Sequence, residues 1–76
     1  MKILGIDMGW SKSVSCVLDS DSGGAVYQAI VTGKEPFAKR IEQAHCDLVV
    51  IEAGPMAGWV ADLCEQRNQK LLPRSL

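Results

Sequence analysis

The first part of the chain carries apolar residues in the patterns of three β-strands. Lys2–Met8 is apolar on both faces apart from Asp7, which is typical of a central strand in a sheet. Val14–Leu18 alternates with a period of two, as a half-buried strand does. Ala25–Thr32 is rich in Val, Ile and Tyr, and a turn-forming cluster at Asp19–Gly24 precedes it. These segments predict an antiparallel meander.

After Gly33 the pattern changes to the spacing of a helix, and Pro36 can occupy its first turn. The apolar stripe of this predicted helix, near Pro36–Ala44, consists of Phe37, Ile41 and Ala44. Its predicted polar face consists of Lys39, Arg40 and Glu42.

The rest of the chain alternates strand and helix. Asp47–Glu52 is a short apolar run of the buried-strand type, Pro55–Asn68 has a second helical stripe, and Lys70–Leu72 predicts a short last strand. The order β-β-β-α-β-α-β predicts an α/β fold with a mixed sheet of five strands. Right-handed crossovers would make the first, fourth and fifth strands parallel neighbours and would place both helices on one face.

Composition limits the class of protein. The chain has 76 residues, 47% of them hydrophobic and 22% charged, which fits one small globular domain. The net charge of −1 argues against strong DNA binding by this chain alone. Three cysteines in apolar runs, with no CxxC pair, suggest small buried thiols and a cytoplasmic location. No run approaches the ~18 residues that span a bilayer, and no signal-peptide pattern precedes the first strand.

Asp7 and Glu52 are the leading candidates for a functional site. In the predicted topology they follow neighbouring parallel strands, at the carboxyl edge where open α/β sheets bind ligands. A carboxylate within a central strand is costly to desolvate, and a divalent cation such as Mg²⁺ or Mn²⁺ would relieve that cost for both acids. The structural alternatives are a turn-capping role for Asp7 and an exposed strand terminus for Glu52.

Two residues of the first hairpin are candidates for contact with nucleic acid. Trp10 could stack on a base or pack over the hairpin. Lys12 could touch a phosphate, although a solvated hairpin lysine is the simpler interpretation. Trp59, by its place in the second helical stripe, is expected in the core.

Two stretches, "GIDMGWSKSVSCVLD" and "VVIEAGPMAGWVADLCEQRNQKLL", resemble the start of the DEDD transposases of the 110 family of bacterial insertion sequences. The resemblance implies an RNase H-like domain akin to RuvC resolvases, in which four acids hold two metal ions for phosphodiester cleavage and strand transfer on DNA. Asp7 matches the first acid and Glu52 the second. Glu52–Pro55 departs from the family's Glu-Ala-Thr/Cys-Gly stretch by one residue.

The last two acids of the family come from a later helix, which these 76 residues do not reach. Residues 1–76 therefore correspond to a single partial domain, truncated before the C-terminal helix. With two of the four catalytic acids, the fragment is expected to bind Mg²⁺ or Mn²⁺ weakly and to lack nuclease activity.

Two other classes remain open. Actin, sugar kinases and heat-shock ATPases also begin with an Ile-Asp-x-Gly strand and a Ser/Thr-Lys hairpin, so Ile6–Lys12 also fits an ATP-binding module. The chain lacks a second Asp-Gly-rich phosphate hairpin, and Trp10 is bulky for that role. The third class is a non-catalytic oligomerisation remnant. A sheet with helices on one face predicts a homodimer, formed through the uncovered face or the Lys70–Leu72 edge.

Overall fold

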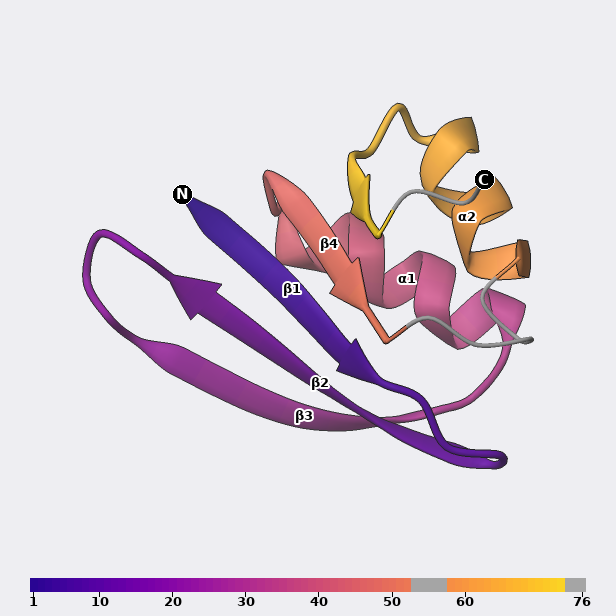
Figure 1. Ribbon diagram of the computed structural model, residues 1–76. Helices are drawn as coiled ribbons and strands as arrows, with labels where there is room; N and C mark the ends of the chain where they lie inside the picture. Colours follow the sequence, from indigo (N-terminus) through magenta and orange to yellow (C-terminus); the bar gives the residue numbers. More distant parts are fainter. Residues whose placement is uncertain (53–57, 74–76) are drawn as a thin grey trace.

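The computed structural model describes residues 1–52 and 58–73, and the element order in them agrees with the predicted order (Figure 1). The elements are β1 (Lys2–Asp7), β2 (Lys12–Asp19), β3 (Ala25–Val31), α1 (Lys34–Ala44), β4 (Leu48–Ile51), α2 (Gly58–Gln66) and β5 (Leu71–Leu72).

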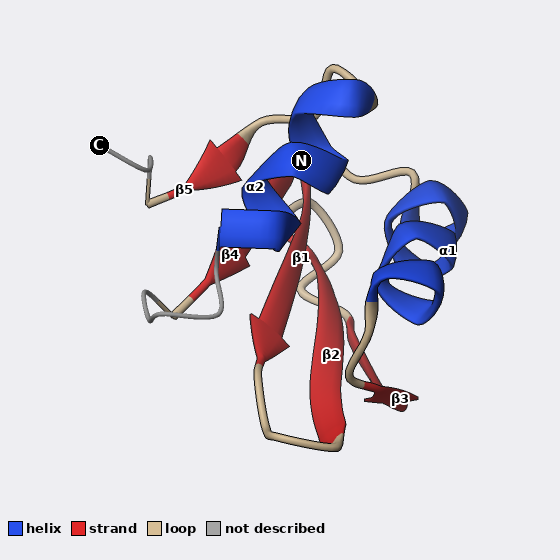
Figure 2. Cartoon of the chain, turned by 90° about the vertical axis from the view of Figure 1, so that its right-hand side faces the viewer, coloured by secondary structure: helices blue, strands red, loops and turns tan. Residues whose placement is uncertain are grey.

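The five strands form one mixed sheet in the order β3-β2-β1-β4-β5, which can be followed from right to left in Figure 2. β1 pairs antiparallel with β2, and β2 pairs antiparallel with β3, so the predicted meander is confirmed. β4 runs parallel to β1 on one side and to β5 on the other. The first, fourth and fifth strands are therefore the parallel neighbours that the alternating pattern predicted.

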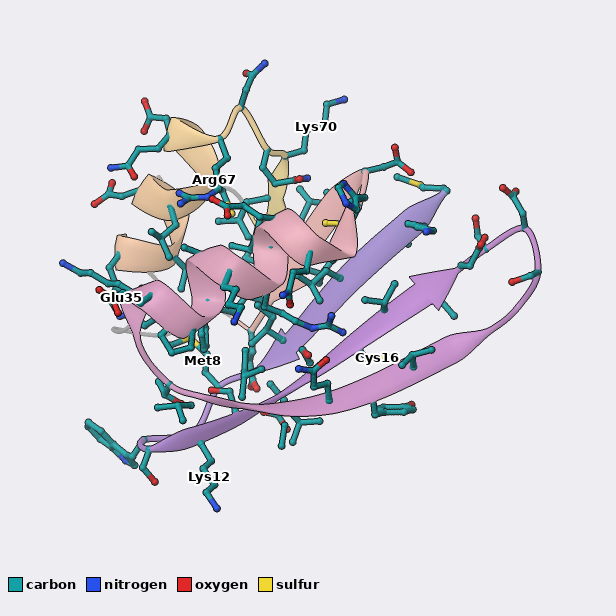
Figure 3. The ribbon with its side chains drawn as sticks, turned by 180° about the vertical axis from the view of Figure 1, so that it is seen from behind. Met8, Lys12, Cys16, Glu35, Arg67 and Lys70 are labelled. Carbon is teal, nitrogen blue, oxygen red and sulfur yellow. The ribbon has the colours of Figure 1, made fainter. Side chains whose placement is uncertain are left out.

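Both helices pack on one face of the sheet. Figure 1 shows α1 behind β4, and Figure 3, from the opposite side, shows α1 in front of the strands. Alternate residues of β1 and β4 face the helices and form the core with them; the buried apolar residues are Leu4, Ile6, Phe37, Ile41, Ala44, Val49, Ile51, Val60, Leu63 and Cys64. Trp59 packs against this core as expected, with its ring 5.0 Å from that of Phe37 at an interplanar angle of 51°.

The helix ends follow from local backbone chemistry. α1 begins at Lys34, two residues before the predicted start, and the Phe37 N–H bonds to the Gly33 carbonyl. His45, with φ of 47°, ends α1 in the left-handed conformation. Asn68, with φ of 53°, closes the turn after α2 as predicted. The predicted start of α2 at Pro55 lies outside the described residues.

β2 turns its serine face toward the helices. Ser13 and Ser15 are at most 1% exposed, whereas Val14 and Leu18 on the other face are 46% and 40% exposed. The alternation predicts the strand correctly, but polarity alone would place the apolar face inward. The register of the sheet places the serine face inward instead, because Ser15 lies opposite Ile6 of β1, whose side chain belongs to the core.

Hydrogen bonds offset the cost of burying the two hydroxyl groups. Ser13 Oγ lies 2.6 Å from Thr32 Oγ1, and Ser15 Oγ donates to the Gln28 carbonyl at 2.9 Å. Buried polar groups are tolerated when such partners exist. The inner side of the meander is therefore a hydrogen-bonded layer rather than a hydrophobic one.

Arg40 corrects a prediction, because it does not lie on the solvated face of α1. Arg40 is only 8% exposed, and its Nε donates a hydrogen bond to Ser15 Oγ at 2.9 Å. Arg40 follows Phe37 by three positions and precedes Ala44 by four, so helical geometry places it beside the apolar stripe. Its hydrocarbon stem can be buried there while the guanidinium reaches β2.

The cysteines are free thiols with different surroundings. Cys64 is buried in the core, as predicted, whereas Cys16 and Cys46, which were also predicted to be buried, are only half-buried. Desolvation raises the pKa of both Cys46 and Cys64 above the ordinary thiol value.

Within residues 1–52 and 58–73, no helix has the length and apolar character needed to cross a membrane.

Candidate functional site

The register of β1 and β4 places Asp7 next to Glu52. Ile6 pairs with Ile51 across these parallel strands, and Asp7 and Glu52 are the next residue on each chain. Neighbouring strands lie about 4.8 Å apart. The two arrowheads point to the same end of the sheet in Figure 1, so both acids sit at the carboxyl edge that the topology predicted.

Both acids face away from the helices. Their neighbours Ile6 and Ile51 point into the core, and side chains alternate along a strand. Asp7 and Glu52 are consequently exposed, which corrects the expectation of a desolvated carboxylate within a central strand. Asp7 is the last residue of β1 and lies on the face that neither helix covers, so water reaches it.

A shallow depression of about 500 Å³ lies on this open face of the sheet. Its lining includes Asp7, Val14, Cys16, Tyr27, Val50 and Glu52. The two carboxylates thus border an apolar floor that crosses four strands. Tyr27, which is 72% exposed, supplies a phenol at one side of this floor.

The β1–β2 hairpin projects from the same end of the sheet. Trp10 is 89% exposed, so it does not pack over the hairpin. Its ring is accessible, as stacking on a base would require. Lys12 is also exposed, and Figure 3 shows its side chain extending away from the body of the molecule. Neither residue contacts the acids through a hydrogen bond or ion pair within the described part of the chain.

The base of this hairpin is held by a small hydrogen-bond network. The Gly9 N–H donates to Ser13 Oγ at 3.3 Å, and Thr32 Oγ1 donates to the Gly9 carbonyl at 2.8 Å. A Cβ at Gly9 would overlap the carbonyl oxygen of Lys12, so the turn requires glycine. These hydrogen bonds therefore fix the base of the hairpin, while Trp10 at its tip is exposed to solvent.

The donor set of the acid pair fits a hard divalent cation. Two carboxylates offer the oxygen ligands that Mg²⁺ and Mn²⁺ prefer. Across the described ranges, no group of three or more His, Cys, Asp or Glu side chains is arranged to hold a metal. Water or a group from another molecule would have to complete the coordination sphere.

Sequence reasoning found the acids but not the floor between them. Val14, Cys16 and Tyr27 line the depression because β2 turns its apolar face outward. The alternation of apolar and polar residues in β2 and β3 is visible in the sequence. Without the register of the sheet, however, it does not show which of the two faces the helices cover. No protein-family model matches the chain, and no curated protein matches it.

Proposed function

We propose that this chain is the N-terminal part of an RNase H-like, metal-dependent DNA transposase of the DEDD type. The observation that carries the proposal is the neighbouring position of Asp7 and Glu52 at the carboxyl ends of two parallel strands. The sheet order and the open acidic edge agree with the fold that the resemblance implies. Together these features favour phosphodiester chemistry over the other classes.

In this proposal, Asp7 and Glu52 hold one divalent cation weakly. A bound Mg²⁺ or Mn²⁺ supplies Lewis-acid activation of water and stabilises a leaving oxygen. Two-metal chemistry needs both ions fixed, and a single carboxylate pair cannot fix them. The 76 residues by themselves are therefore not expected to cleave DNA. The exposed Trp10 and Lys12 contribute nucleic-acid contacts at the same end of the sheet.

The uncovered face supports the accompanying proposal of a homodimer. Val14, Leu18, Tyr27 and Val31 expose large apolar side chains there, and such patches mark interfaces. Sedimentation equilibrium at micromolar concentration should give twice the mass of one chain. A monomer that persists across dilution would contradict the dimer.

The three free thiols suit a reducing compartment, and the cytosol is the proposed location.

The metal hypothesis is tested by paramagnetic broadening with Mn²⁺. In ¹⁵N-labelled protein, amide signals around Asp7 and Glu52 should broaden first, and Asp7→Asn should remove the effect. Asp62→Asn is the matched control, since Asp62 is an exposed carboxylate on α2, which packs on the face of the sheet opposite the acid pair. Uniform broadening, or the same response in both variants, would refute the site.

Two further incubations separate the function classes. Linear and branched DNA with Mg²⁺ or Mn²⁺ should remain uncut, and cleavage abolished by Asp7→Ala would overturn the proposed inactivity of the fragment. Addition of ATP should leave the hairpin signals unchanged, because the Gly9 N–H already donates to Ser13. Saturable shifts of the hairpin amides with ATP would favour the nucleotide-binding class.

A further inference from the structure

A second hollow, of about 260 Å³, lies between β3 and α1, on the side of the sheet opposite the acid pair. Its polar lining consists of Gln28, Lys39, Arg40 and Gln43. Two of these four side chains are cationic and two are neutral amides. None of its lining residues within the described part of the chain is acidic.

Arg40 is the unusual member of this group. It is more than nine-tenths buried, yet no carboxylate of residues 1–52 or 58–73 lies within ion-pair distance of it. Arginine stays protonated in proteins, so the charge cannot be lost. A buried charge without a counter-ion is costly. The fold nevertheless keeps it at the wall of the hollow.

Within the described residues, a single hydrogen bond fixes the orientation of Arg40 and leaves four of its five N–H donors unused. Nε donates to Ser15 Oγ at 2.9 Å, and that hydroxyl in turn donates to the Gln28 carbonyl. Neither Nη nitrogen donates to any atom of the described residues. In the same residues, no side-chain nitrogen is both fully buried and without a partner. The Nη pair therefore retains access to solvent.

We propose that this hollow binds a small dianionic phosphate, either inorganic phosphate or the phosphoryl group of a monoester. The planar Nη fork of arginine matches two phosphate oxygens, and the Lys39 ammonium adds a second charge. The amides of Gln28 and Gln43 supply neutral donors. At about 260 Å³ the hollow is smaller than the sites of drug-sized ligands, so it suits the anion itself rather than a large attached group.

Two positive charges favour a dianion over a singly charged diester. This distinguishes a phosphate monoester from the backbone of a nucleic acid, whose phosphates each carry one charge. The site is also independent of the proposed transposase function, because Ser15 and Arg40 lie on the helix side of the sheet and Asp7 and Glu52 on the other.

The test is an NMR titration of the whole chain with inorganic phosphate at pH 8 and constant ionic strength, with chloride as the reference salt. The Nε–H signal of Arg40 and the side-chain amides of Gln28 and Gln43 should shift and saturate in the millimolar range. Lys39→Gln should weaken binding by about fivefold, the upper value for an exposed charge pair. Lys34→Gln, an exposed lysine on the same helix but outside the hollow, should leave affinity unchanged.

Arg40→Lys keeps the charge but loses the fork, so it should abolish saturable binding while circular dichroism confirms the fold. Should that variant unfold, Lys39→Gln against Lys34→Gln still decides the question. Methyl phosphate should bind like inorganic phosphate, and dimethyl phosphate should bind at least tenfold more weakly. Equal binding of dimethyl phosphate, a non-saturating response, or equal affinities in the two lysine variants would overturn the proposal.

Discussion

Replacing Ser15 with alanine removes the hydroxyl that joins Arg40 to the sheet. Ser15 Oγ accepts from Arg40 Nε at 2.9 Å and donates to the Gln28 carbonyl at 2.9 Å, in a position with no exposed surface. Ser15→Ala leaves a buried charged donor without its partner, which costs about 1.5–3 kcal/mol, and loses a second bond worth about 1 kcal/mol. We expect a total loss near 3 kcal/mol.

For a domain of this size, a loss of about 3 kcal/mol lowers Tm by roughly 12–24 °C. The measurement is urea unfolding followed by circular dichroism, which gives the free energy of unfolding for each variant. Lys39→Met is the surface control, since Lys39 is the exposed neighbour of Arg40; it should change stability by no more than about 0.5 kcal/mol.

A double-mutant cycle isolates the Ser15–Arg40 interaction from the rest of the change. Arg40→Met keeps a long stem and removes the guanidinium, and the double variant should be more stable than the sum of the single losses predicts. Groups in direct hydrogen-bond contact show coupling free energies of about 0.5–3 kcal/mol. Additive losses, with coupling within about 0.3 kcal/mol of zero, would refute the claim that this bond secures the buried charge.

Four further outcomes follow from the structure. Gly9→Ala should destabilise the protein by about 1–3 kcal/mol in urea unfolding, because the new Cβ would overlap the Lys12 carbonyl. Iodoacetamide should label the half-buried Cys16 in the native protein and spare the buried Cys64, as read by peptide mass spectrometry. Burial raises the pKa of Cys64, so the unfolded thiol ionises first and the free energy of unfolding should fall as pH rises above about 8.5. Asp7→Asn should change the free energy of unfolding by no more than about 0.5 kcal/mol, since the carboxylate is exposed.

The order of elements could be predicted because period and turn chemistry are local. The change from period two to helical spacing after Gly33 required no knowledge of distant residues, and it located α1 within two residues of its observed start. The acid pair could also be predicted, because parallel neighbours end at the same edge. Asp7 and Glu52 needed only the element order and one topological rule.

The faces of β2 and the place of Arg40 could not be predicted in the same way. Ser15 is buried because its partners come from β3 and α1, 13 and 25 positions later in the chain. An amphipathic pattern describes which residues are apolar, and it does not include the hydrogen bonds that make a polar face suitable for burial. The polar interior of the meander therefore became visible only with the register.

The position of β3 has a consequence for how the chain emerges during synthesis. β3 is an edge strand without charge or proline, and six of its seven residues are exposed. It is complete before α1 and β4 exist, and residues 32–51 take roughly 1–4 s to add at about 5–20 residues per second. During that interval both edges of the meander are unpaired, and β4 later pairs with β1 while no strand of the described residues pairs with the outer edge of β3. The finished domain therefore keeps β3 as an unpaired and uncharged edge, the kind that templates aggregation between chains, whereas the β1 edge is open only until β4 has been made.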